Sequence, residues 1–115
     1  MQTIAIEVPV SDLHRAKQFY ETVFGHAPTD VIEEDGRVRT VIDGMPGIYL
    51  NQTPGFVPTA EGSLPYFHVE DLDSALAAVS SAGGRVVEQP APRADLGRFA
   101  LVLDSEGNGL YLHGS

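Results

Sequence analysis

The chain contains no cysteine, and this absence excludes disulfide bonds, thiolate metal sites and a cysteine nucleophile. Basic residues are also scarce: 7 Lys and Arg stand against 16 Asp and Glu, the formal net charge is −9, and no stretch clusters the cations. Because such a chain repels phosphate, no nucleic-acid partner is expected. No apolar run approaches the ~20 residues that span a bilayer, and no basic segment precedes the first strand-like run. We therefore expect no membrane partner and a cytoplasmic location.

The 115 residues, of which 43% are hydrophobic, suit one domain with a single packed core. Residues 2–10 alternate as a half-buried strand does, and Asp12 then stands where a helix N-cap is expected, before an apolar stripe that ends at Gly25. Extended runs follow at 28–33, 37–43 and 47–51. The segment 52–62 is rich in Pro and Gly, which predicts a connecting loop.

The same plan recurs in the second half of the chain. The pattern predicts a strand at 64–69, a helix from Asp71 to Gly83, and strands at 85–89, 98–104 and 109–113. A shift of 59 residues places Asp12 on Asp71, and a shift of 62 places GIYL (47–50) on GLYL (109–112). Each half therefore has the order β-α-β-β-β. We expect one domain, 1–115, with modules 1–51 and 63–115 joined by the loop 52–62.

The stretches DLHRAKQFYETVFG, DLDSALAAVSSAGGRVVEQ and GRFALVLDSEGNGLYL together resemble the vicinal oxygen chelate superfamily, which includes glyoxalase I, bleomycin-resistance proteins and extradiol dioxygenases. The resemblance covers nearly the whole chain and is closest to small bacterial glyoxalase-like proteins. It implies an α+β fold in which two β-α-β-β-β modules form one curled mixed sheet, an open cup with the helices outside and the ligand inside. It also implies a homodimer.

The metal-using members of this family place their ligands on the first and last strands of each module. The matching positions in this chain are Ala5, Tyr49, Leu64 and Tyr111. None of these is an ordinary ligand for Zn, Ni, Fe or Mn. We therefore predict no cofactor at the family's positions, which argues against metal-assisted glyoxalase or dioxygenase chemistry.

Strand alternation divides the strand residues into a helix-facing set and a cup-facing set. The predicted cup-facing residues are Ala5, Glu7, Tyr49, Asn51, Leu64, Tyr66, His68, Tyr111 and His113. A mostly apolar and aromatic wall with a few polar groups is typical of a small-molecule site. The alternative is that the tyrosines fill a collapsed barrel.

Glu7 is the candidate catalytic residue, because a carboxylate in an apolar strand that faces a ligand could act as a general base. The alternative is a structural ion pair with an arginine such as Arg39 or Arg98. His68 and His113 share the predicted face of Glu7, and two imidazoles with one carboxylate have the composition of a facial metal triad. A divalent metal at these non-standard positions is therefore a further alternative.

The segment RADLGR, 93–98, is expected to cover the mouth of the site, where Arg98 could present a cation to the ligand or be a plain surface residue. The preferred function is metal-independent binding of a small planar or aromatic molecule, as in bleomycin-resistance proteins, and the acidic chain favours neutral or cationic ligands. The alternative is a glyoxalase-like isomerase or lyase that uses Glu7 as its base, with or without a divalent ion. A structural or partner-binding module is the third hypothesis.

Overall fold

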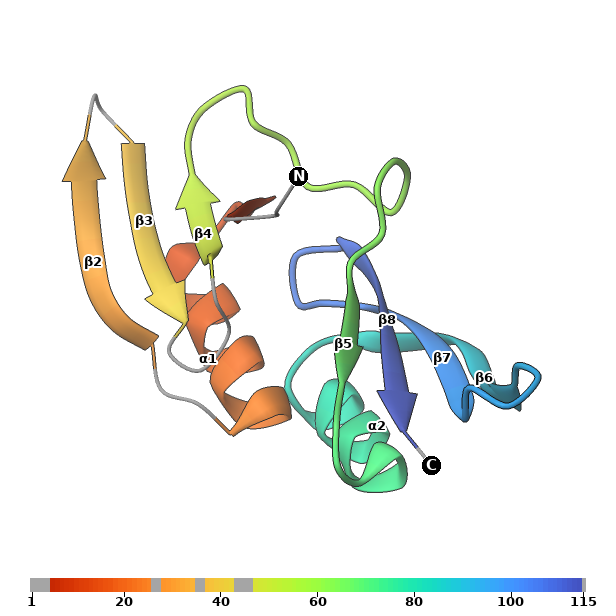
Figure 1. Cartoon of the computed structure of the whole chain (residues 1–115). Coiled ribbons are helices and arrows are strands. Elements are labelled where there is room, and N and C mark those ends of the chain that lie inside the picture. The colour runs from red at the N-terminus through yellow and green to blue at the C-terminus, as the bar shows by residue number, and fades with distance from the viewer. Residues whose placement is uncertain (1–4, 26–27, 35–36, 43–46, 115) are drawn as a thin grey trace.

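The computed structural model describes residues 5–25, 28–34, 37–42 and 47–114 (Figure 1). The start of the predicted strand 2–10 and the end of 37–43 lie outside the described residues. The first half contains β1 (Ile6–Pro9), α1 (Leu13–Phe24), β2 (Pro28–Glu34), β3 (Arg37–Ile42) and β4 (Ile48–Gln52). The second half contains β5 (Tyr66–His68), α2 (Leu72–Ser81), β6 (Arg85–Pro92), β7 (Arg98–Leu103) and β8 (Gly109–Gly114). The predicted α+β class and the repeated β-α-β-β-β order are confirmed.

Each half forms its own four-stranded mixed sheet, so the expected curled sheet is divided in two. The strand orders are β1-β4-β3-β2 and β5-β8-β7-β6. β1 pairs with β4 and β5 with β8 in parallel, whereas the other pairs are antiparallel. β1 and β5 are consequently edge strands, one in each sheet.

Both helices begin at the repeated Asp-Leu pair. The Asp12 side chain accepts a hydrogen bond from Arg15 N, and the Asp71 side chain accepts one from Ser74 N, each at 3.0 Å. An aspartate at the N-cap satisfies one of the backbone N–H groups that the first turn leaves without a partner. Neither helix of the described chain is long and apolar enough to cross a lipid bilayer.

One core joins the two halves. α1 packs on β3 and β4, α2 packs on β6 and β8, and the two helices contact each other. The ring of Phe24 on α1 meets that of Phe67 on β5 at 5.1 Å between centroids. The largest fully buried apolar side chains are Tyr20, Phe19, Leu50, Leu72, Leu110, Leu112, Val10, Val79 and Val102. Because the helices cover one face of each sheet, the opposite faces point away from this shared core.

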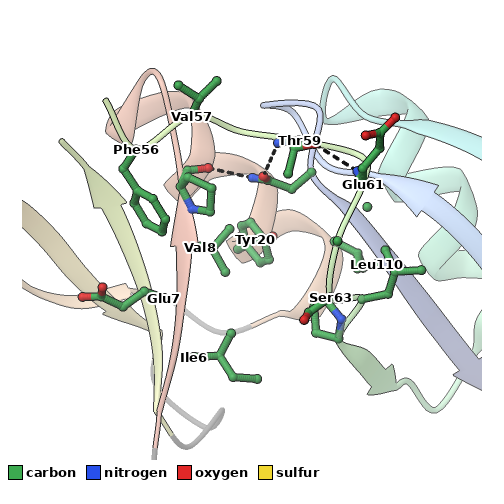
Figure 2. A pocket seen from close by; sticks show the side chains of 16 residues that line it. Ile6, Glu7, Val8, Tyr20, Phe56, Val57, Thr59, Glu61, Ser63 and Leu110 are labelled. Atoms are coloured by element: carbon green, nitrogen blue, oxygen red, sulfur yellow. Dashed lines mark hydrogen bonds between the residues drawn. The ribbon is translucent and has the colours of Figure 1, made fainter. Parts of the chain in front are cut away.

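A cavity of about 490 Å³, here called the seam cavity, lies where the two sheets meet. Ile6 and Val8 of β1, Tyr20 of α1 and Leu110 of β8 surround it (Figure 2). Figure 2 shows the carboxylate of Glu7 turned away from the cavity. Neighbouring β1 residues thus lie on opposite faces of the strand, as the alternation of side chains requires.

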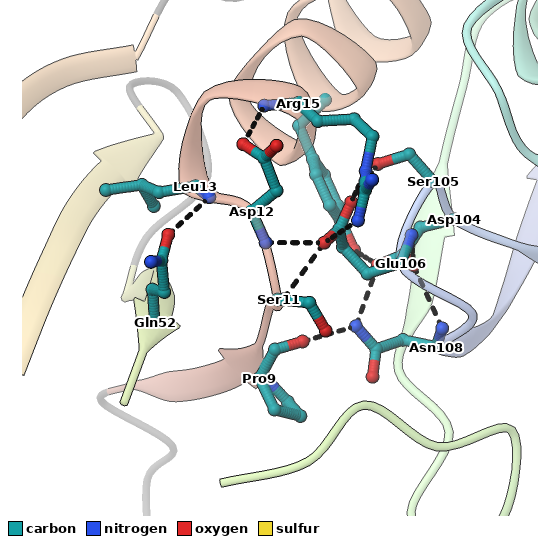
Figure 3. A network of polar contacts seen from close by, with 11 residues as sticks. Pro9, Ser11, Asp12, Leu13, Arg15, Gln52, Asp104, Ser105, Glu106 and Asn108 are labelled. Atoms are coloured by element: carbon teal, nitrogen blue, oxygen red, sulfur yellow. Dashed lines mark hydrogen bonds and ion pairs between the residues drawn. The ribbon is translucent and has the colours of Figure 1, made fainter. Parts of the chain in front are cut away.

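The turn between β7 and β8 bonds the second half to the start of α1 in the first (Figure 3). Glu106 Oε1 accepts hydrogen bonds from the backbone N–H groups of Ser11 and Asp12, both at 2.9 Å. Glu106 Oε2 lies 2.7 Å from Arg15 Nε, and the Glu106 side chain is fully shielded from solvent. Gln52 Oε1 accepts a further bond from Leu13 N at 2.7 Å. The N-terminus of α1 is therefore held from both halves.

Glu106→Gln is expected to lower the free energy of unfolding at pH 7 by about 2 kcal/mol, because a neutral amide replaces a charged acceptor of several hydrogen bonds. Burial alone would raise the pKa of Glu106, but hydrogen bonds from Arg15, Asp12, Ser105 and Ser11 lower that pKa below its ordinary 4.5. The stabilisation is therefore complete above pH 4.5 and is lost as pH falls through the lower pKa of the folded state.

Urea unfolding across this pH range, with the exposed Glu70→Gln as a control, measures the effect. The difference between the wild type and Glu106→Gln should shrink below pH 4.5. Asp104 makes the opposite contribution to the pH dependence of stability, since burial raises its pKa above the ordinary 3.8 and its ionised form lowers stability. Both proteins contain Asp104, so subtracting the stability of Glu106→Gln from that of the wild type at each pH removes this contribution. A difference that stays constant with pH would contradict the role of the Glu106 carboxylate.

Candidate ligand-binding site

The outward face of the second sheet has a cluster of aromatic rings. Tyr66 on β5 and Tyr111 on β8 are register partners. Their rings stack with 4.5 Å between centroids and an interplanar angle of 14°. Phe99 on β7 meets the Tyr66 ring edge-on at 5.9 Å. Tyr66 is 53% exposed, so about half of this residue is open to solvent.

Arg93 lies over these rings. Its guanidinium carbon is 4.6 Å from the centroid of Tyr111 and 4.7 Å from that of Phe99. Arg93 Nη1 also donates to the Tyr66 hydroxyl at 3.2 Å. Hydrogen bonds with the hydroxyls of Tyr66 and Tyr111 raise the pKa of Arg93 above its ordinary value. We call Tyr66, Phe99, Tyr111 and Arg93 the aromatic platform.

Arg98 was the predicted cation of this loop, and neither Arg93 nor Phe99 was predicted as a site residue. In the structure Arg98 Nη2 lies 3.5 Å from Asp73 Oδ1 on α2. Strand β6 runs to Pro92, whereas the predicted strand stopped at 89. Pro90 and Pro92, which follow the predicted end, are compatible with an edge strand, and β6 is an edge of its sheet. Had the strand been predicted to continue to residue 92, Arg93 would have been expected directly after it, beside the rings of β7 and β8.

His68 and His113 are register partners on the same sheet, next to the platform. Their Nδ1 atoms are 2.9 Å apart, and His113 Nε2 is hydrogen-bonded to the carbonyl oxygen of Leu96. Since a carbonyl only accepts, His113 has its proton on Nε2 when neutral and its Nδ1 accepts from His68. The pair therefore holds the loop 93–97 against β8.

Glu7 and Tyr49 lie on the first sheet, where they are register partners. Arg39 Nη1 donates to Glu7 Oε1 at 3.1 Å, and the Arg39 guanidinium carbon is 5.6 Å from the Tyr49 ring centroid. This contact is the arginine ion pair that was one of the two alternatives for Glu7. Asn51 is buried, and its side-chain oxygen accepts from Thr53 Oγ1.

Six of the nine predicted cup residues thus form two groups on the outward faces of different sheets, whereas Asn51 is buried, Leu64 precedes β5 and lines the seam cavity, and Ala5 precedes β1. Glu7, with Tyr49, is on the first sheet, and the two histidines are on the second. Within the described part of the chain, no three His, Asp or Glu side chains are grouped so that they could hold a metal. At the family's ligand positions, Ala5 and Leu64 have no donor atom. The residues present do not fit that metal site.

The platform has the chemistry of a stacking and hydrogen-bonding surface. Tyrosine rings bind flat apolar surfaces, and their hydroxyls donate or accept. The Arg93 guanidinium makes cation–π contacts with the electron-rich ring faces and keeps N–H groups that can donate to a ligand. Among the described residues no carboxylate forms an ion pair with Arg93.

Known proteins with similar sequences and structures agree with this fold. The family model for the Glyoxalase/Bleomycin resistance protein/Dioxygenase superfamily matches residues 3–112. The putative glyoxylase CFP32 of Mycobacterium tuberculosis is 43% identical over 95 residues, which are 80% of this chain and 36% of that protein. The chain therefore spans well under half the length of this relative.

Two solved structures illustrate the structural likeness. TnmS3, an antibiotic binding protein from Streptomyces sp. CB03234, has a TM-score of 0.70 and 25% identity over 99% of this chain and 95% of that one. The fosfomycin resistance protein FosX from Listeria monocytogenes has a TM-score of 0.74 and 16% identity over 100% of this chain and 93% of that one. With the family model and the sequence relative in agreement, the chain belongs to the Glyoxalase/Bleomycin resistance protein/Dioxygenase superfamily.

Proposed function

We propose that this protein binds a small planar or aromatic molecule on the aromatic platform, without a metal. The observation that supports this most directly is the open stack of Tyr66 and Tyr111 beneath the Arg93 guanidinium. A ligand ring can stack on the exposed Tyr66 face while a polar group accepts hydrogen bonds from Arg93. TnmS3, whose fold this chain shares, is an antibiotic binding protein, which supports the same class of function.

The position of Arg93 changes the expected ligand. The net charge of −9 favours neutral or cationic compounds, but that charge is spread over the surface. Contact with the Arg93 guanidinium favours an anionic group locally, because bonds between a guanidinium and a carboxylate are short and strong, whereas the Glu88 carboxylate at the platform makes only a long contact, 3.4 Å, with the Tyr111 hydroxyl. We therefore infer that an aromatic carboxylate binds more tightly than its amide.

We also infer that two copies associate as a homodimer that closes the site. A single chain leaves the platform on an outward sheet face and places Glu7, Arg39 and Tyr49 on the outward face of the other sheet. A second copy can place its first-sheet face opposite this platform. Glu7 would then be held by Arg39 at the wall of the site, a geometry that favours a positioning role over that of a general base.

Titration of intrinsic fluorescence tests the binding proposal. The chain has 4 tyrosines and no tryptophan, so the signal comes from tyrosine alone. A panel of aromatic carboxylates and their amides should contain saturable binders. The double substitution Tyr66→Ala and Tyr111→Ala should weaken the best of them by about tenfold or more, and Arg93→Gln should remove the preference for carboxylates.

Phe56→Ala is the matched control, since it removes an aromatic ring from the loop that follows β4. It should leave binding on the platform unchanged. Circular dichroism checks the fold of every variant, and light scattering with and without ligand gives the oligomeric state. Unaltered affinity in the double variant would show that the platform is not the site.

A further inference from the structure

The seam cavity is separate from the aromatic platform and opens on the opposite side of the strands. Its walls come from both halves of the chain: β1 and α1 on one side, and 61–65 with the start of β8 on the other. Its volume of about 490 Å³ lies within the usual range for small-molecule sites. The apolar residues that line it include Ile6, Val8, Tyr20, Phe56, Leu64 and Leu110.

The open edge of β1 adds directional groups to these apolar walls. Ile6 N donates to Gly47 O and Val10 N donates to Asn51 O, so the even-numbered residues of β1 bond to β4. In a parallel pair the intervening residues turn their peptide groups to the other side. Pro9 has no N–H, and its carbonyl oxygen accepts from Asn108 Nδ2 at 2.7 Å. The N–H and carbonyl of Glu7 are thus the directional backbone groups along this edge of the cavity.

The charges around the cavity restrict what can enter it. Among the described residues its lining contains no Lys, Arg or His; Glu7 contributes its backbone, since its carboxylate is turned away and paired with Arg39, and Glu61 is the remaining acidic residue of the lining. The polar side chains at its floor are already satisfied, since the Tyr20 hydroxyl donates to Asp104 Oδ2 at 2.8 Å and Asn108 bonds to Pro9. An anion would find no counter-charge here, whereas an apolar molecule would lose little hydration.

The loop over the mouth points to the same kind of occupant. Phe56 is 37% exposed and Val57 is 69% exposed, and both line the cavity. Ile6, at the edge of β1, is 37% exposed as well. A ligand in the cavity would cover these exposed apolar side chains and gain the corresponding free energy of burial.

We propose that the seam cavity is a second binding site, for an uncharged and largely apolar small molecule with one group that hydrogen-bonds to the Glu7 peptide. The occupant would touch both halves of the chain, so binding would stabilise their association as well as the fold. This site is independent of the platform, whose ligand stacks on the other face of the second sheet.

N-phenyl-1-naphthylamine is a suitable probe, because it is neutral, apolar and fluorescent in apolar surroundings, and has one N–H group. We expect saturable fluorescence enhancement with the wild-type protein and a rise in its melting temperature. Two substitutions fill the cavity from opposite walls: Ile6→Trp on β1 and Ser63→Trp on the loop before β5, where Ser63 is exposed. Each should weaken probe binding by about tenfold or more.

Val87→Trp is the matched control, since Val87 is a 45% exposed residue of β6 and does not line the cavity. It should bind the probe as the wild type does, and so should the Tyr66→Ala and Tyr111→Ala double variant. If Ile6→Trp fails to fold, Ser63→Trp alone decides, because Ser63 lines the cavity at an exposed position, where a larger side chain does not crowd the core. The proposal is overturned if the probe does not saturate, if no folded filling variant weakens it, or if the double variant abolishes it.

Discussion

Gly84→Ala should destabilise the protein by about 3 kcal/mol, the upper end of the usual cost of overpacking a core. A Cβ atom at position 84 would meet the carbonyl oxygen of Leu103, and would lie 2.6 Å from Phe19 Cε2 and 2.9 Å from Val79 Cγ1. Phe19 and Val79 are fully buried, and the Leu103 oxygen belongs to the backbone of β7. None of the three can move without disturbing the contact between α1, α2 and the second sheet.

The adjacent Gly83 provides a matched control. Its φ of +93° favours glycine, but a Cβ there would meet only Ser105 Cβ, at an ordinary 3.7 Å. Gly83→Ala should therefore cost about 1 kcal/mol, through backbone strain alone. Urea unfolding of both variants separates the two causes. Equal losses at 83 and 84 would mean that the close approach at Gly84 does not exist.

Asn108→Ala should lower the free energy of unfolding by a similar amount, about 3 kcal/mol, because it leaves several buried polar groups without partners. Asn108 is 7% exposed. Its Nδ2 donates to Pro9 O at 2.7 Å and to Asp104 Oδ2 at 3.0 Å, and its Oδ1 accepts from Thr59 N at 3.1 Å. One side chain thus joins β1, the connecting loop and the β7–β8 turn.

Asn108→Asp distinguishes these hydrogen bonds from simple packing, because it keeps the shape. It would place a second carboxylate beside Asp104, whose pKa burial already raises. The variant should be strongly destabilised at pH 7 and should recover part of the loss below about pH 5, when one of the two carboxyl groups is protonated. The exposed Gln89→Ala is the control. Equal stability of Asn108→Asp and wild type at pH 7 would contradict the role of Asn108.

The order of the elements could be predicted from the sequence because the signals are local. A helix begins where an aspartate caps it, as Asp12 and Asp71 do, and the alternation of a strand separates buried from outward residues. The repeated tetrapeptides GIYL and GLYL follow this pattern, since their aliphatic residues are buried: Ile48, Leu50, Leu110 and Leu112. The family itself was suggested by the resemblance of particular stretches, such as DLHRAKQFYETVFG and GRFALVLDSEGNGLYL, and not by these local signals.

Two glycines at equivalent positions of the repeats are required for different physical reasons, which local sequence patterns do not distinguish. Gly25 and Gly84 align when the sequence is shifted, and both follow a helix. Gly25 has a φ of +73° and open space around its Cα, so it ends α1 by its backbone conformation. Gly84 is required by crowding from α1 and β7. Only the packing of distant segments distinguishes the two reasons.

The candidate site divides in the same way. Alternation placed Tyr66, His68, Tyr111 and His113 on one face, where register pairs them, because that relation depends on neighbouring strands alone. It could not show that Arg93 covers the rings, since this depends on where β6 ends, nor that Glu7 binds Arg39. Nor could it show that the side chain of Asn108 bonds to residues 99 and 49 positions away in the sequence.

The sequence by itself determined the repeated β-α-β-β-β modules, their helix caps and the shared face of Tyr66, His68, Tyr111 and His113, because these follow from contacts within a few residues or one strand pair. Only the tertiary structure decided how the two modules join. That junction consists of the helix contact, the β7–β8 turn on the start of α1, and the apolar cavity between the sheets. No local pattern records it, because its partners are brought together by burial of the shared core.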